Sequence, residues 1–223
     1  MSKIFSIAID GPAGAGKSTV AKALARELGA MYLDTGAMYR AFGLAILRMG
    51  IDTHDRPAVV SHIGDVEVSV AFTDGQQRLL LGDEDVTDAI RQPEVAAAAS
   101  DVSTAPEVRR HMVALQQKIA RGHSVIMDGR DIGTDVLPDA TLKIYLTASA
   151  EQRARRRTQE LKLKGLPADY DQVLQDIQAR DYQDTHRAAS PLRVAEGAVV
   201  VDTSDMTLEE AVAAVRALAE RVI

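Results

Sequence analysis

The chain has 223 residues, of which 46% are hydrophobic and 26% are charged, with a net charge of −6 and no cysteine. This balance is typical of a globular protein with one sizeable core and room for an insertion. The acidic charge excludes a nucleic-acid-binding surface over the whole molecule, and the absence of cysteine excludes a disulfide scaffold or a cysteine-based zinc site. No apolar run approaches the ~18 residues that a membrane span needs. The first nine residues are too short for a signal peptide, so we expect a cytoplasmic protein that binds neither membranes nor nucleic acid.

Short apolar runs alternate with helical patterns along the chain. The runs that read as buried strands are 4–9, 124–127, 142–146 and 199–201. The helical patterns cover 17–28, 37–49, 106–121, 150–163, 171–184 and 208–222, and Gly29 is predicted to end the first of them. Strands that alternate with helices predict an α/β fold with a parallel sheet flanked by helices, and such sheets bind ligands at the carboxyl ends of their strands.

A glycine-rich motif follows the first predicted strand. Residues 11–18 read GPAGAGKS and match the P-loop pattern G-x-x-x-x-G-K-[ST] between a strand and a helix. Its glycines let backbone N–H groups face a phosphate, and the helix directs its positive dipole end there. We expect Lys17, as a catalytic residue, to bridge the β- and γ-phosphates of ATP, and the Ser18 hydroxyl to bind Mg²⁺. The predicted ATP site is Gly11, Pro12, Ala13, Gly14, Ala15, Gly16, Lys17, Ser18 and Thr19.

One region departs from the alternation of strands and helices. Residues 66–72 alternate with period two, 73–76 read as a hairpin turn, 78–81 as a return strand and 83–87 as a third short strand. This pattern predicts a small antiparallel domain over residues 57–91. It would be inserted into a P-loop core formed by residues 1–56 and 92–223.

Several uses of a P-loop can be separated by sequence. The chain contains no asparagine, so it lacks the Asn-Lys-x-Asp segment with which a GTP-driven switch reads guanine. The strand at 124–127 leads into Asp128, Gly129, Arg130 and Asp131 instead of the adjacent carboxylates of a mechanical ATPase. Asp128 is a second candidate for the metal, and Arg130 is a candidate phosphate clamp. These features favour a small-molecule kinase.

Arginines concentrate after the predicted strands and in one helix. Because a planar guanidinium binds phosphate through two hydrogen bonds, this distribution favours a phosphorylated acceptor. The arginines at loop or helix ends are Arg40, Arg109, Arg130, Arg180 and Arg187. The segment at about 150–167 is predicted to be a lid over ATP, with Arg153 and Arg157 four residues apart on one helical face as catalytic arginines.

These residues resemble the motifs of bacterial cytidylate kinases, a nucleoside monophosphate kinase-like P-loop family. The likeness covers essentially the whole chain in order: the P-loop, LDTGAMYR at 33–40, the inserted antiparallel unit, DGRDIGT at 128–134, the lid and RDYQDTHR at 180–187. Thr35 stands where many relatives carry serine and keeps the hydroxyl. The resemblance implies ATP-dependent phosphorylation of CMP and dCMP to CDP and dCDP with Mg²⁺. It also implies that the insert is an NMP-binding subdomain.

The resemblance further implies a CMP site. Its residues are Thr35, Tyr39, Arg40, Ser100, Arg109, Gly129, Arg130, Asp131, Arg180, Asp184 and Arg187. Phosphate would be held by Arg40, Arg130 and Arg187, and ribose by Arg180 and Asp184. Cytosine would be read by Thr35, Ser100, Arg109 and Asp131.

The chemistry of cytosine supports this assignment. A carboxylate accepts from the N4 amino group and an arginine donates to N3 and O2, whereas uracil places an acceptor at position 4. An internal ion pair of Asp131 with Arg130 or another arginine is the structural alternative. The alternatives for the whole chain are a kinase of another small acceptor, such as shikimate, and a nucleotide-binding regulatory module. We expect a monomer, since no exposed apolar helical stripe stands out.

Overall fold

The computed structural model describes residues 4–73 and 75–223, so Asp74 in the predicted hairpin turn lies outside the described residues. The chain divides into two compact units. Met1–Ala30 and Ser124–Ile223 form the first, here called the P-loop unit, and Met31–His123 forms the second, the hairpin unit. The hairpin unit is larger than the predicted insert at 57–91, because helices on both sides of the insert pack together and against its strands. Among the described helices, none is long and apolar enough to cross a membrane.

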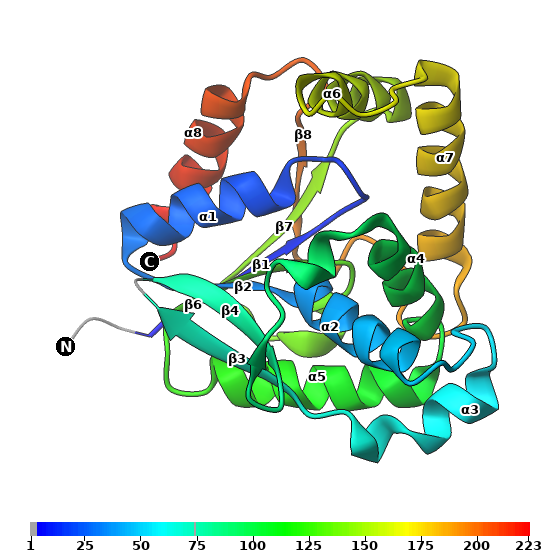
Figure 1. Ribbon diagram of the computed structural model, residues 1–223. Coiled ribbons are helices and arrows are strands. Elements are labelled where there is room, and N and C mark those ends of the chain that lie inside the picture. Colours follow the sequence, from blue (N-terminus) through cyan, green and yellow to red (C-terminus); the bar gives the residue numbers. More distant parts are fainter. Residues whose placement is uncertain (1–3, 74) are drawn as a thin grey trace. The chain divides into compact units, whose positions relative to one another are not determined.

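The P-loop unit contributes four strands to a parallel sheet (Figure 1). They are β1 (Ser6–Asp10), β6 (Val125–Gly129), β7 (Leu142–Thr147) and β8 (Val199–Asp202), in the order β6-β1-β7-β8. Asp10 at the end of β1 pairs with Gly129 at the end of β6 and with Tyr145 of β7. The loops that follow β1 and β6 therefore leave the same edge of the sheet, and the predicted parallel α/β fold is confirmed.

Helices accompany this sheet. They are α1 (Lys17–Leu28), α6 (Ala150–Leu163), α7 (Tyr170–His186) and α8 (Leu208–Ala219), with a short π-helical turn at Ile132–Val136. α1 packs against β6 and α8 through its buried face, which includes Val20 and Leu24, while α6 packs against α7. α1 ends at Gly29, whose left-handed conformation closes the helix as predicted.

The hairpin unit begins with β2 (Met31–Asp34) and α2 (Thr35–Arg48), followed by α3 (Arg56–Ser61) and a 3₁₀ turn at Ile63–Asp65. Its antiparallel sheet has the order β3-β4-β5, with β3 (Val68–Thr73), β4 (Gln76–Leu81) and β5 (Glu84–Asp85). A second 3₁₀ turn (Ala89–Arg91), α4 (Pro93–Val102) and α5 (Pro106–Ala120) complete it. All three predicted strands of the insert are present.

The alanine run at 96–99 lies inside α4. This run packs against α2 at Gly43, where a Cβ atom would lie 2.9 Å from the backbone nitrogen of Ala99. The backbones of α2 and α4 therefore approach so closely that only a small residue fits between them. β2 and α3 were not predicted, because four and six residues are too few to display a period.

Candidate active site

The loop between β1 and α1 has the geometry of an anion-binding turn. Gly11, Gly14 and Gly16 have φ values of 148°, 77° and 90°. Gly16 is the N-cap of α1; no described side chain caps this end, and its first turn carries no acidic residue. The first backbone N–H groups of α1 are therefore not taken up by a capping side chain, which is the arrangement that favours phosphate at a helix N-terminus.

Lys17 is buried at the start of α1, and its Nζ donates a hydrogen bond of 2.8 Å to the carbonyl oxygen of Pro12. Burial, and after it the nearby Arg130 guanidinium, lowers the pKa of Lys17 to about 7. Carboxylates, Asp128 first among them, oppose this shift. Lys17 and Arg130 thus act on each other electrostatically within the P-loop unit, as groups that converge on one polyanion would.

Ser18 and Asp128 form the site best suited to a magnesium ion. The Ser18 hydroxyl donates to Asp128 Oδ2 at 2.8 Å, and Asp128 is buried at the end of β6. Hydroxyl and carboxylate oxygens are the hard ligands that Mg²⁺ prefers. Among the described residues, no three or more His, Cys, Asp or Glu side chains are grouped to hold a metal. The residues present therefore fit an ion that takes most of its ligands from phosphates and water.

Asp10, which the sequence analysis did not single out, supports the turn after β6. Its Oδ1 accepts from the backbone N–H of Ile132 at 2.8 Å and its Oδ2 from that of Gly133 at 2.7 Å. Burial raises the pKa of Asp10 to about 6, and the two backbone hydrogen bonds oppose the shift. Asp10 thereby caps the turn that begins after Asp131 and holds it to the end of β1. The partners lie more than a hundred residues away in sequence, so only the fold reveals them.

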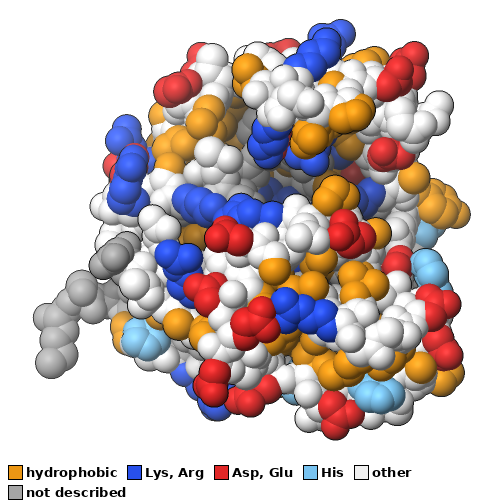
Figure 2. All heavy atoms as spheres, viewed as in Figure 1, with side chains coloured by type: hydrophobic (Ala, Val, Ile, Leu, Met, Phe, Trp, Pro, Cys, Tyr) orange, Lys and Arg blue, Asp and Glu red, His pale blue; other side chains and the backbone are white. Residues whose placement is uncertain are grey.

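The two predicted lid arginines occupy different environments on α6. Arg153 is buried; its Nη atoms pair with both carboxylate oxygens of Asp181 on α7, and Nη1 also donates to the carbonyl of Ala13 in the P-loop at 3.0 Å. Arg157 is exposed and donates to Glu160 at 2.8 Å. Figure 2 shows Lys and Arg side chains on the surface where Figure 1 draws α6. Arg153 thus ties the P-loop to α6 and α7, while Arg157 remains on the solvent side.

Asp184 contacts two of the arginines that are predicted to bind the acceptor in the P-loop unit. Arg130 Nε donates to Asp184 Oδ2 at 2.7 Å, and Arg187 Nη1 lies 3.8 Å from Asp184 Oδ1. Burial opposes ionisation of Asp184, but Arg130, Arg180 and Arg187 outweigh it and hold the pKa of this carboxyl below its ordinary value. Asp184 therefore pairs with Arg130. Asp131 lies at the N-cap of the π-helical turn, is buried and forms no hydrogen bond that caps this turn.

The other predicted acceptor residues belong to the hairpin unit. Thr35 is the first residue of α2, and Arg40, one turn later, donates to Asp34 Oδ2 at 2.9 Å. Arg109 of α5 is buried with its guanidinium carbon 5.4 Å from the centre of the Tyr39 ring, a cation–π distance. Ser100 lies in α4. The fold of this unit therefore brings Arg109 and Tyr39 together from different helices.

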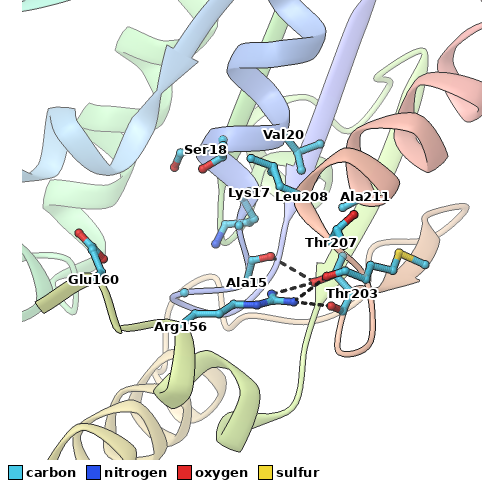
Figure 3. A pocket seen from close by; sticks show the side chains of 14 residues that line it. Ala15, Lys17, Ser18, Val20, Arg156, Glu160, Thr203, Thr207, Leu208 and Ala211 are labelled. Atoms are coloured by element: carbon cyan, nitrogen blue, oxygen red, sulfur yellow. Dashed lines mark hydrogen bonds between the residues drawn. The ribbon is translucent and has the colours of Figure 1, made fainter. Parts of the chain in front are cut away.

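A cavity of about 400 Å³ adjoins the P-loop (Figure 3). Its walls come from P-loop residues 14–19, from α6 and from the segment that joins β8 to α8. Arg156 of α6 donates to the carbonyl of Thr203 at 2.5 Å and to that of Met206 at 3.3 Å, which fixes this segment against α6. Val20, Leu208 and Ala211 supply apolar surface suited to a planar base. This pocket was not predicted from the sequence, although a loop after a parallel strand is the expected place for one.

The fold and site define the class of this protein as a P-loop kinase. Its fold is similar to that of a shikimate kinase from Bacteroides thetaiotaomicron, with a TM-score of 0.51 and 14% sequence identity over 98% of this chain and 99% of that one. Identity this low supports the fold alone.

Sequence relatives define the family. The family model described as cytidylate kinase matches residues 7–221. A cytidylate kinase of Caldicellulosiruptor bescii is 52% identical over 99% of this chain and 98% of its own length. One of Mycolicibacterium paratuberculosis is 55% identical over 93% of this chain and 91% of its own. The chain belongs to the cytidylate kinase family, whose members are phosphotransferases with a phosphate group as acceptor, and the predicted resemblance is confirmed.

Proposed function

We propose that the protein transfers the γ-phosphoryl group of ATP to CMP or dCMP and releases ADP with CDP or dCDP. The observation that carries this proposal is the set Arg130, Asp184 and Arg187, which lies in the same unit as the P-loop. Arg130 and Asp184 of this set interact electrostatically with Lys17. A cationic set of this kind beside a triphosphate cradle is suited to a second phosphorylated ligand. The membership of the chain in the cytidylate kinase family supports cytosine as its base.

On the donor side, backbone N–H groups of the loop at 11–19, in which only Pro12 has none, bind the phosphates, and Lys17 neutralises charge between the β- and γ-phosphoryl groups. Ser18 and Asp128 would hold Mg²⁺, which neutralises phosphate charge when bound. Arg153 and Arg157 would cover the transferring group and exclude water from it.

On the acceptor side, Arg40, Arg130 and Arg187 would hold the CMP phosphate, whose oxygen attacks the γ-phosphorus as the bond to the β-phosphate oxygen breaks. This oxygen is already nucleophilic, so no strong general base is required. Arg180 and Asp184 would contact ribose, while Asp131 would accept from cytosine N4 and Arg109 donate to its ring acceptors. Tyr39 and Gly129 are further residues of the proposed CMP site.

The pocket beside the P-loop would hold the adenine ring of ATP. Arg156 fixes two carbonyl groups of its wall, those of Thr203 and Met206. We expect Arg156→Ala to raise KM for ATP about tenfold and to leave KM for CMP unchanged, because charged hydrogen bonds that shape the donor pocket alone are lost. Arg155→Ala is the matched control, since this exposed neighbour bonds only Gln152, at 3.4 Å, among the described contacts. An equal rise of KM for ATP in both variants would contradict the assignment.

An acceptor panel tests the function. ADP release is measured with CMP, dCMP, UMP, AMP and shikimate, and CMP and dCMP are expected to exceed UMP in kcat/KM by about 10- to 100-fold. Equal or better turnover with UMP or AMP contradicts the cytosine assignment. Activity with shikimate alone indicates a different kinase, and ATP binding without acceptor-stimulated turnover indicates a regulatory module. We further propose that the protein acts as a monomer in the cytoplasm, with small-molecule substrates only.

A further inference from the structure

The antiparallel sheet of the hairpin unit is joined to both ends of α2 by side-chain contacts. At the first end, Gln77 of β4 bonds the backbone of Asp34, which is the N-cap of α2. At the last end, the two Nη atoms of Arg48 donate to the two carboxylate oxygens of Glu84 on β5, at 2.7 and 2.9 Å. α2 lies between these contacts and carries three of the proposed CMP-binding residues. The sheet therefore braces a helix of the acceptor site.

Gln77 makes its contact with both ends of its amide group. The backbone N–H of Asp34 donates to Gln77 Oε1 at 2.7 Å, and Gln77 Nε2 donates to the Asp34 carbonyl at 3.2 Å. Side chains alternate along a strand, so Gln77 shares a face of β4 with Leu79, which is 2% exposed. Gln76 lies on the opposite face and is exposed. Gln77 thus belongs to the packed face of the sheet and fixes both polar backbone groups of one residue.

Asp34 transmits this constraint to Arg40. Its Oδ1 accepts from the backbone N–H of Ala37 at 2.8 Å and caps α2, while its Oδ2 accepts from Arg40 Nη2 at 2.9 Å. A Cβ atom at Gly36 would lie 3.2 Å from Asp34 Oδ1, so a side chain at this position would crowd the carboxylate that caps α2. The direction of the Arg40 guanidinium therefore depends on where the Asp34 backbone is held.

We propose that Gln77 is a positioning residue for the acceptor phosphate, acting through Asp34 on Arg40. The proposal rests on the proposed function, in which Arg40 binds the phosphate of CMP. A guanidinium donates two parallel hydrogen bonds to phosphate only when its planar edge faces the ligand, so a rotation of Arg40 weakens binding without removing charge. In this proposal the inserted hairpin keeps Arg40 oriented toward the phosphate of CMP.

Steady-state kinetics of the full chain test this role. Gln77→Ala and Gln77→Met, which keeps the length and packing of the side chain, are each expected to raise KM for CMP about fivefold to tenfold. We expect kcat and KM for ATP to stay within about twofold of wild type, because only acceptor binding is affected. Gln76→Ala is the matched control on the exposed face and should leave all three constants unchanged. Glu84→Ala removes the contact at the other end of α2 and should leave KM for CMP unchanged, with at most a small decrease in the thermal midpoint because the pair is exposed.

A double-mutant cycle with Arg40→Ala separates positioning from general weakening of the fold. If Gln77 acts through Arg40, Gln77→Ala adds less than about twofold to KM for CMP in the Arg40→Ala background. A full fivefold to tenfold increase in that background overturns the proposal, as does an unchanged KM for CMP in Gln77→Met or an equal rise in KM for ATP. Wild-type protein without turnover of CMP contradicts the proposed function itself, so the two failures are distinguishable.

Discussion

Lys17→Met is expected to lower kcat with ATP and CMP about 10²- to 10³-fold. The ammonium group is the buried cation at the start of α1, where the proposed transfer develops negative charge between the β- and γ-phosphates. Methionine keeps the length of the side chain and removes its charge. The measurement is coupled ADP release at saturating ATP and CMP, and a normal kcat would contradict the P-loop assignment.

The stability of the same variant separates loss of function from loss of fold. Burial lowers the pKa of Lys17 from 10.5 to about 7. Between these values the unfolded state binds the proton and the folded state does not, so this group makes stability rise with pH. Below about pH 7 the folded state keeps a buried ammonium at a free-energy cost that methionine lacks. We therefore expect the thermal midpoint of Lys17→Met at about pH 6.5 to be at least that of wild type, and a marked decrease would indicate a structural role instead.

Gly11→Ala is expected to lower the thermal midpoint by about 10 °C or more and to abolish ATP binding. A Cβ atom at this position would lie 1.9 Å from the carbonyl oxygen of Leu146 on β7, and the φ of 148° is itself unfavourable for alanine. The first residue of the P-loop thus packs directly against the backbone of the neighbouring strand. Either the P-loop or β7 must move to relieve this clash. A shift of β7 disturbs the sheet, and a shift of the loop disturbs the ATP site.

Gly29→Ala is the matched control for this clash. Gly29 also has a positive φ, 62°, but no atom lies within 4 Å of its Cβ position. Only the backbone conformation is penalised there, by about 1–2 kcal/mol, which is a smaller decrease in the thermal midpoint. Thermal unfolding and ATP titration of the two variants isolate the effect of the contact with Leu146, and equal decreases would contradict it.

Local sequence patterns predicted the helices, strands and turns whose conformation depends on residues close together in the sequence. The helix at 17–28 was predicted with the same ends that the structure gives, because its apolar spacing and Gly29 are read within one segment. The period-two pattern and turn at 66–81 predicted the antiparallel strands for the same reason. The P-loop motif predicted the loop between β1 and α1, since its glycines satisfy a backbone geometry that is set locally.

The sequence alone predicted the P-loop class and the alternation of strands and helices, and it supplied the candidate residues of the proposed acceptor site. The pairing of charged side chains with their partners became visible only in the folded chain. The fold paired Arg130 with Asp184, separated buried Arg153 from exposed Arg157, and joined Asp10 to Ile132 and Gly133. It also joined Gln77 to Asp34, across 43 positions. The reason is physical: periodicity reports the burial of one face of an element, whereas a hydrogen bond between distant residues forms only after packing has set the distance between two elements.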